Sequence, residues 1–418
     1  MHGNEYVCID FKGLPMSLPK KFSEPMLAAE RVVFSGTGQS DVGRKLERSA
    51  IDLTLDAALE AIADAGLDPS DIDGLSSYPG VRKDISPGFG PVALADVKNA
   101  LGLQLRWHSA GWEGPAQAGA IVNACMAVAS GLCRHVLIFR TVTEGSSTSV
   151  ERKASVSGTG GDRISGPFQW MVPFRGYSAV HLAAVYANRH FHDFGTTREA
   201  LGQIAINNRA NAALNPKAVF TAPIAMEDYL SARMISTPLC LLDCDVPVDA
   251  STAIVVSSAD ALADIARPVF LDSMGCALQG RDSWDNFSSD LTAMAAHDAA
   301  KHMWSQTDLT PSDVDTAQLY DGFSMLALTW LEALGFCGKG EAKDFLKDGK
   351  NIARDGLLPL NTNGGQLSGG RTHGFGYFHE AITQLKGRAG GRQLQRKPKV
   401  AVVANGGGPL GSCFLLKV

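Results

Sequence analysis

The sequence predicts an α/β protein made of two related halves, each a sheet covered by helices, stacked as an α/β/α/β/α body. Two observations predict this class. A short pattern that follows a helix occurs twice, as LDPSDID at 67–73 and LTPSDVD at 309–315. Apolar runs rich in β-branched residues are also spread over both halves, which is typical of strands buried on both faces. Sheets and helices with apolar faces bury them by stacking in layers.

The helix before each copy of the pattern has one apolar face. In the first helix this face consists of Ile51, Leu55, Ala58, Leu59 and Ile62. In the second it consists of Leu291, Met294, Ala295, Ala299 and Met303. In each copy the Pro-Ser-Asp turn stops the helix and a short strand follows, at 74–77 and 316–319. Tyr78 and Tyr320 then stand at equivalent positions.

A second correspondence supports the repeat. An alanine-rich helix at 119–131 precedes a strand at 136–139, and a helix at 379–387 precedes a strand at 400–403. Further buried strands are expected at 32–34 and 253–256. Residues 143–235 interrupt this order, first with a Ser/Gly-rich stretch and then with helices at 179–190 and 198–214. We interpret this insertion as a loop domain over a substrate cleft.

The expected domains are therefore an N-terminal extension at 1–29, a first half at 30–265 that includes the loop domain, and a second half at 266–418. The net charge of −5 argues against nucleic acid as the main partner. The basic stretch at 386–399 is interpreted as a solvated loop. The chain has no apolar run of membrane-spanning length and no signal core, so a cytoplasmic protein is expected.

Three classes of cofactor or cross-link are not expected. The eight cysteines are scattered, which does not indicate a disulfide framework. Cys240 and Cys244 lack further ligands at suitable spacing, so no metal site is expected. Gly36-Thr-Gly38 begins a dinucleotide fingerprint, but Asp41 replaces its third glycine.

Several motifs together resemble the sterol-carrier-protein type of thiolase, over nearly the whole chain from about residue 30. They are YSAVHLAAVYANRHFHDFG, NNRANAALNP, PLCLLDCDVPVDASTAIVV, YDGFS, LEALGFCGKGEAKDF, NTNGGQLSGGRTHGFG and ANGGGPLG. The resemblance implies the thiolase fold, in which two similar halves carry a loop domain and two chains usually form a dimer. It also implies an acyl-CoA substrate, with coenzyme A entering as part of the substrate and no bound cofactor.

The chain departs from that family at the catalytic positions. The position of the nucleophilic cysteine falls on Gly114, and Cys125 lies further on, in a helix interior. The family's catalytic histidine aligns with Arg371, its second cysteine with Ala404 or Asn405, and the histidine of its His-Asp/Glu-x-Phe motif with Tyr320. Without a thiol there is no acyl-enzyme by the usual route.

These replacements resemble the thiolase-like aldolases that shorten steroid side chains. In those proteins a Tyr-Asp pair replaces the histidine motif, and a small OB-fold partner with a zinc ribbon is present. Their second tyrosine is missing here, because the candidate positions are Gly369 and Phe375 and Tyr377 is two residues away. The resemblance therefore implies an aldolase-like site with a different second acid, or a different reaction.

Four side chains are the candidate catalytic groups. We expect Tyr320 to act as base or acid, although a free phenol has a pKa of roughly 10 and needs a nearby cation or donor to ionise. Arg371 and His373, from the glycine-rich loop, are the candidates for that support, and His373 can also exchange a proton near neutrality. Asp321 is expected to orient its neighbours or to bind backbone. Tyr320 could instead be a buried tyrosine with a satisfied hydroxyl, and His373 could simply hold the turn that follows.

Backbone groups are the candidates for binding the oxyanion. Gly406 and Gly407 are expected in a turn after the last buried strand, where N–H groups can point at a developing negative charge, although the turn could be purely structural. Glu113, beside the vacant position Gly114, could be a carboxylate in the pocket or could cap the following helix.

The sequence leaves three functions open. The first is a lyase that cleaves a β-hydroxyacyl-CoA, with a steroid side chain as one candidate, by a retro-aldol reaction. The second is an acyltransferase of the thiolase type. The third is a non-catalytic acyl-CoA or lipid binder.

Overall fold

The computed structural model describes residues 31–81, 87–111, 116–147, 168–176, 178–264, 267–280 and 290–418. Its main strands are β1 (Val32–Gln39), β2 (Gly74–Ser77), β3 (Trp107–Ala110), β4 (His135–Thr143), β7 (Asp249–Ser258), β8 (Val269–Leu278), β9 (Thr316–Leu319), β10 (Val400–Gly407) and β11 (Leu410–Lys417). Within these ranges they form one nine-stranded mixed sheet in the order β3-β2-β4-β7-β1-β8-β11-β10-β9.

This strand order contains the same unit twice. The first half runs β2-β4-β7-β1 and the second runs β9-β10-β11-β8. In both units the first pair is parallel and the next two are antiparallel. The halves meet where β1 pairs with β8, and β3 is an extra edge strand of the first half. The expectation of two similar α/β halves is confirmed, and the boundary predicted at 265–266 falls on residues outside the described ranges.

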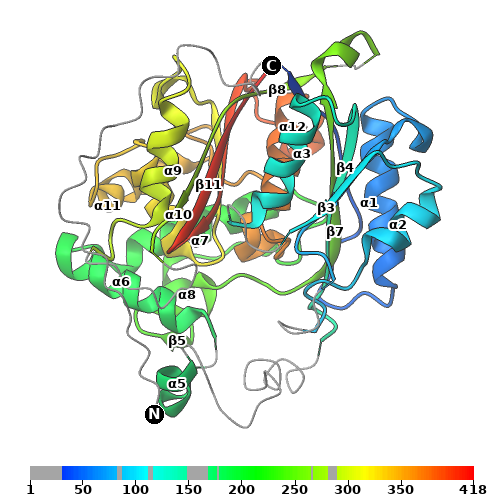
Figure 1. Ribbon diagram of the computed structural model, residues 1–418. Coiled ribbons are helices and arrows are strands. Elements are labelled where there is room, and N and C mark those ends of the chain that lie inside the picture. The colour runs from blue at the N-terminus through cyan, green and yellow to red at the C-terminus, as the bar shows by residue number, and fades with distance from the viewer. Residues whose placement is uncertain are drawn as a thin grey trace, which may run out of the picture.

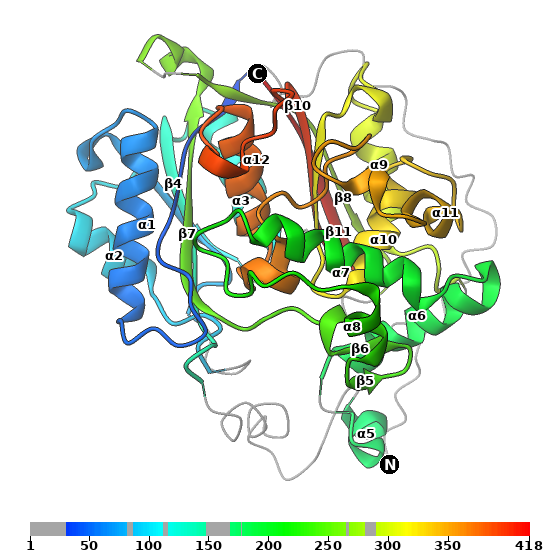
Figure 2. The ribbon, with the colours of Figure 1, turned by 180° about the vertical axis from the view of Figure 1, so that it is seen from behind.

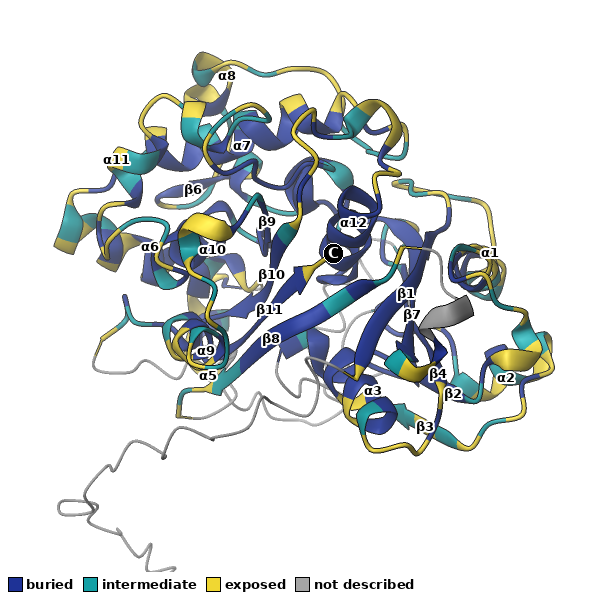
Figure 3. Cartoon of the chain, turned by 90° about the horizontal axis from the view of Figure 1, so that it is seen from above, coloured by how far each residue is buried: buried dark blue, intermediate teal, exposed yellow. Residues whose placement is uncertain are grey.

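Helices form three layers around the two halves of the sheet (Figure 1). In the view from behind, the same layers appear in reverse order (Figure 2). The helices on the outside of the first half are α1 (Ala50–Asp64) and α2 (Leu94–Leu101), those in the centre are α3 (Gly119–Ala129) and α12 (Phe375–Leu385), and those on the outside of the second half are α9 (Ala295–Trp304), α10 (Ser324–Ala333) and α11 (Ala342–Leu346). Helix α12 and most of the strands are buried, whereas α1, α2, α9 and α11 expose one side (Figure 3). The predicted five-layered body is confirmed.

Glycines allow the outer helices to lie directly on the strands. A Cβ on Gly36 of β1 would lie 2.1 Å from the Ala61 carbonyl oxygen in α1. A Cβ on Gly275 of β8 would lie 1.9 Å from the Ala299 carbonyl oxygen in α9, at the equivalent place in the second half. A glycine is therefore required at both contacts. Gly36, the first residue of the incomplete dinucleotide fingerprint, serves helix packing.

The repeated Pro-Ser-Asp turns also adopt the same structure. Each forms a short 3-10 helix, at Pro69–Asp71 and Pro311–Asp313. In each, the aspartate carboxylate accepts a 2.8 Å hydrogen bond from the backbone N–H three residues earlier. Because this local cap is the same in both halves, the same residue pattern forms the same turn before the strand that follows it.

The insertion within the first half packs against the second half. Its described elements are α5 (Phe168–Met171), α6 (Val180–Phe194), α7 (Arg198–Ala212), α8 (Met226–Ser231), β5 (Met234–Ser236) and β6 (Leu239–Cys240). The two helices expected here are confirmed as α6 and α7. Asn207 and Asn211 of α7 donate hydrogen bonds of 3.0 and 2.9 Å to the Leu360 carbonyl. Helix α7 thereby holds the start of the glycine-rich loop. None of the helices in the described ranges has the length and apolar composition of a membrane span.

Candidate active site

Three segments from different parts of the chain meet at the end of β10. The backbone N–H of Tyr320, just after β9, donates to the Ala404 carbonyl at 3.1 Å. A Cβ on Gly406 would lie 2.6 Å from the Cβ of Ala116, which precedes the central helix α3. The glycine-rich loop at 361–376 forms the third side, because Gly374 packs on Asn405. The expected site residues Glu113 and Gly114 lie outside the described residues.

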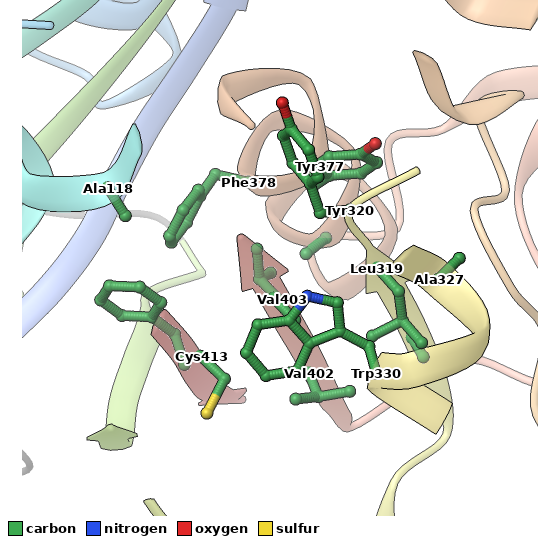
Figure 4. Close-up of a cluster of buried hydrophobic side chains, with 14 of the residues drawn as sticks. Ala118, Leu319, Tyr320, Ala327, Trp330, Tyr377, Phe378, Val402, Val403 and Cys413 are labelled. Carbon is green, nitrogen blue, oxygen red and sulfur yellow. The ribbon is translucent and has the colours of Figure 1, made fainter. Parts of the chain in front are cut away.

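Tyr320 is nearly buried, with 7% of its surface exposed. Its hydroxyl lies 3.4 Å from Nε2 of Gln117, which comes from the segment next to the vacant nucleophile position. The hydroxyls of Tyr320 and Tyr377 both point away from the apolar cluster around Trp330 (Figure 4). A negative charge on the Tyr320 oxygen would attract both Arg140 and Arg371.

Asp321 is fully buried and its carboxylate accepts several hydrogen bonds. The donors are the Tyr377 hydroxyl, the Asn208 side-chain amide and the backbone N–H groups of Gln366, at 2.8 Å, and Leu367, at 3.5 Å. Burial nevertheless raises the pKa of Asp321 to about 6. A Cβ on Gly365 would lie 2.1 Å from the carboxylate, so the loop can close over Asp321 only with glycine there.

Tyr377 is held by Asp321 from both sides of its hydroxyl. It donates to the carboxylate and accepts a 2.9 Å hydrogen bond from the Asp321 backbone N–H. Burial and the neighbouring carboxylate raise the pKa of Tyr377 well above its ordinary value. Tyr377 therefore remains a neutral phenol that positions Asp321, and it is not an acid free to reach a substrate.

His373 sits in the left-handed region, with a φ of 48°, inside the glycine-rich loop. Its Nδ1 is 2.8 Å from Nη2 of Arg140, and because arginine only donates, Nδ1 must accept. The proton of the neutral ring is then on Nε2, which lies 3.7 Å from a carboxylate oxygen of Glu144. Burial, Arg140 and Arg371 lower the pKa of His373 well below 6.5. Its surroundings favour a neutral hydrogen-bond donor, contrary to the expected proton exchange near neutrality.

Arg371 is held by two acidic residues. Its guanidinium donates to Asp245 at 3.0 Å and to Glu144 at 3.1 Å. Burial by itself lowers the pKa of Arg371, but these carboxylates raise it above its ordinary value. Burial raises the pKa of Asp245 to about 7, against the attraction of Arg371. The arginine at the position of the family's catalytic histidine is thus a permanent cation.

Arg140, the last important member of the site, was not anticipated. It is fully buried in β4 and donates to the carbonyls of Phe89, Tyr78 and Thr141. Burial lowers its pKa to about 10. The sequence did contain a signal for Arg140, because this charged residue directly follows the apolar run at 136–139. A charge at a buried position needs specific partners. Gln117, Asn208 and Gln366 carried no comparable signal.

Gly406 and Gly407, the residues expected to supply the oxyanion donors from a turn, lie in a strand. Gly406 and Gly407 belong to β10 and pair with Gly411 and Leu410 of β11, so the turn begins only at Gly408. The Trp330 indole donates to the Gly406 carbonyl at 3.0 Å. The expectation of a turn at Gly406 was wrong, because the strand pairing continues further than its glycines indicated.

The cysteine and metal chemistry of the described residues is limited. Cys125 lies in α3 and is fully buried, and burial raises its pKa to about 12. Such a thiol is not a nucleophile near neutrality. Within the described ranges, no set of three or more His, Cys, Asp or Glu residues could hold a metal ion.

Comparison with known proteins gives a consistent picture. The family described as "Thiolase C-terminal domain-like" matches residues 282–416. The steroid side-chain-cleaving aldolase of Thermomonospora curvata is 35% identical over 362 residues, which cover 84% of this chain and 90% of the relative. The 17-hydroxy-3-oxo-4-pregnene-20-carboxyl-CoA lyase of Mycobacterium tuberculosis is 34% identical and covers 87% and 93%.

A solved structure agrees with these relatives. The structure named "Ltp2-ChsH2(DUF35) aldolase" matches with a TM-score of 0.82 and 32% identity, over 94% of this chain and 98% of that chain. The shared fold and the identity over most of both chains agree. This chain belongs to the family of thiolase-like side-chain-cleaving aldolases, within the thiolase superfamily.

Proposed function

We propose that this protein is a carbon–carbon lyase that cleaves a β-hydroxyacyl-CoA by a retro-aldol reaction, with a steroid side chain as the acyl group. The observation that carries the proposal is the position of Tyr320, a nearly buried phenol at the end of β10 whose oxygen, if charged, would attract both Arg140 and Arg371. The names of the two curated relatives support the same reaction class and substrate.

The site supports a proton cycle on Tyr320. As a phenolate, Tyr320 takes the proton of the β-hydroxyl while the bond between the α- and β-carbons breaks. The β-carbon leaves as a ketone, and the electron pair of the broken bond forms the enolate of the thioester. Tyr320 then returns the proton to the α-carbon and becomes a phenolate again. Arg140 and Arg371 lower the free energy of the phenolate, and Asp321 and Tyr377 hold the loop in place.

The partner proteins are also part of the proposal. We infer a homodimer, and a small OB-fold protein with a zinc ribbon as a second component. The similar aldolase structure carries a DUF35 protein in its name beside Ltp2, which supports a protein partner.

The activity can be tested with 17-hydroxy-3-oxo-4-pregnene-20-carboxyl-CoA, the substrate in the name of one relative. The chain is incubated with this compound without free CoA, alone and with a DUF35 protein, and products are measured by mass spectrometry. Retro-aldol cleavage yields a 17-oxo steroid and propionyl-CoA. Tyr320→Phe serves as the inactive comparison.

Two other results would replace this proposal. Consumption of free CoA together with a trapped acyl-enzyme would indicate an acyltransferase. Tight binding of the compound without turnover, even with the DUF35 protein present, would indicate an acyl-CoA binding protein.

A further inference from the structure

Asn405 is a buried polar side chain whose amide makes no hydrogen bond to the described residues. It lies in β10 and none of its surface is exposed. Within the part of the chain that the structure describes, neither its Oδ1 nor its Nδ2 has a hydrogen-bond partner. Burial of a carboxamide without a partner costs free energy, and such groups in native proteins generally have another role.

The three segments of the candidate site surround this side chain. Ala404, the residue before it, accepts the backbone hydrogen bond of Tyr320. Gly406, the residue after it, packs against Ala116 at the start of the segment before α3. A Cβ on Gly374 would lie 2.0 Å from Asn405 Oδ1, so the loop at His373 and Gly374 passes directly over the amide.

The face of the sheet on which Asn405 lies shows which way its side-chain amide points. Asn405 of β10 pairs with Ser412 of β11, whose buried hydroxyl also has no partner within the described residues. Phe414, two residues along on the same face of β11, packs on Phe378 of α12 with ring centroids 4.9 Å apart. The amide therefore faces the space between the two halves, where the site lies.

Asn361 shows that the same region can satisfy an asparagine when the role is structural. Its Nδ2 donates to the Leu319 carbonyl at 3.0 Å and its Oδ1 accepts from the Leu319 N–H at 2.7 Å. Both asparagines are fully buried, and both are close to the strand end that carries Tyr320. Asn405 differs from Asn361 because both of its polar side-chain atoms lack a partner among the described residues.

We propose that the Asn405 carboxamide binds the acyl oxygen of the substrate, with Nδ2 donating to the thioester oxygen as this oxygen becomes an enolate. The inference rests on the proposed retro-aldol function and assigns an oxyanion donor to a side chain of β10. A donor without a partner among the described residues is already in place for the charge that develops during the reaction.

The test is the nearly isosteric substitution Asn405→Leu, made in the full chain with its partner protein. Loss of one oxyanion donor should lower kcat/KM for the steroid thioester by about 100-fold. Because the substitution removes no hydrogen bond among the described residues, the melting temperature should stay equal or rise. The matched control is Asn211→Leu, which removes hydrogen bonds to the carbonyls of Leu360 and Asn361 and should lower the melting temperature.

Other outcomes separate this inference from the proposed function. An Asn405→Leu variant that cleaves at the wild-type rate, or that melts earlier and keeps its activity, overturns the role of Asn405 while the lyase assignment stands. If the wild-type protein does not cleave the thioester, the lyase assignment fails, and propionyl-CoA binding by calorimetry then decides the role of Asn405. Affinity at least tenfold weaker in Asn405→Leu supports the contact, and equal affinity overturns it.

Discussion

Tyr78 and Tyr320 follow the equivalent strands β2 and β9, but their surroundings differ. Both are nearly buried. Tyr78 is followed by Pro79, its carbonyl accepts from Arg140 at 3.4 Å, and its ring lies 5.2 Å from the Arg140 guanidinium. Tyr320 is followed by Asp321, and its hydroxyl meets Gln117 from the other half. The same position therefore serves arginine packing in the first half and presents a phenol in the second.

The comparison shows how a duplicated fold can form one site. The loop before α12, with His373, reaches Arg140 and Phe89 of the first half, and the His373 and Phe89 rings are 4.7 Å apart. The segment before α3, with Gln117, reaches Tyr320 of the second half. Each half contributes the start of its central helix to the other, so the candidate site lies between the halves and neither half forms it alone.

The largest effect is expected for Tyr320→Phe, with Tyr78→Phe as its matched control. Tyr320→Phe removes the group that takes the proton and should lower kcat by about 10³-fold. Tyr78→Phe keeps the ring and the carbonyl that contact Arg140, so its kcat should stay within a few-fold of wild type. Steady-state kinetics with the steroid thioester measure both. Equal losses in the two variants would remove the distinction between the halves.

Arg371→Gln should have the next largest effect, on stability. It leaves the buried carboxyl groups of Asp245 and Glu144 without their shared cation, so the free energy of unfolding should fall by about 3–5 kcal/mol. Arg388→Gln, which removes an exposed ion pair with Asp64, should cost about 0–1 kcal/mol. Denaturant unfolding measures both changes. A small loss in Arg371→Gln would show that water enters and solvates this cluster.

Asp321→Asn should lower kcat/KM by about 100-fold, because the carboxylate positions Tyr377 and the loop. Tyr377→Phe should lower it by a similar factor, and a much smaller loss would mean that Asp321 acts without Tyr377. The pH dependence gives a second measurement. If the ionised carboxylate is required, wild-type kcat/KM falls as pH drops through about 6, and the limb due to Asp321 is absent in Asp321→Asn.

The raised pKa of Asp321 also predicts that the free energy of unfolding changes with pH. The folded pKa of Asp321, about 6, lies above its ordinary value of 3.8. The folded protein therefore binds more protons than the unfolded chain between about pH 4 and 6. The contribution of Asp321 to the free energy of unfolding falls as pH rises through this window and then stays constant. Asp321→Asn should remove this part of the slope in unfolding curves measured across the window.

The smallest effect is expected for Cys125→Ala. The thiol is buried in α3 with a pKa of about 12, so kcat should not change. The loss of the buried sulfur should lower the free energy of unfolding by about 1 kcal/mol. Loss of turnover without loss of folding would make Cys125 part of the reaction and would favour the acyltransferase.

Local patterns were enough to predict most of the fold. The strands at 32–34, 74–77, 136–139, 253–256, 316–319 and 400–403 are all observed, because apolar β-branched runs bounded by turns depend little on distant residues. The end of β10 was missed, since pairing with β11 carries Gly406 and Gly407 into the strand. The basic stretch was interpreted as a solvated loop, but Lys386 is buried and its amine donates to the Ser35 carbonyl at 2.6 Å.

What the sequence by itself determined is the duplicated α/β plan, the absence of cysteine at the expected nucleophile position and the Tyr320–Asp321 pair, because each is a property of neighbouring residues or of a repeated spacing. Only the tertiary structure decided that Arg140 fixes the proton of His373 on Nε2, that Tyr377 is held by Asp321 and that Asn405 lacks a partner within the described residues. These features join residues far apart in the chain, and the burial and hydrogen bonding that set their chemistry exist only after the two halves have packed together.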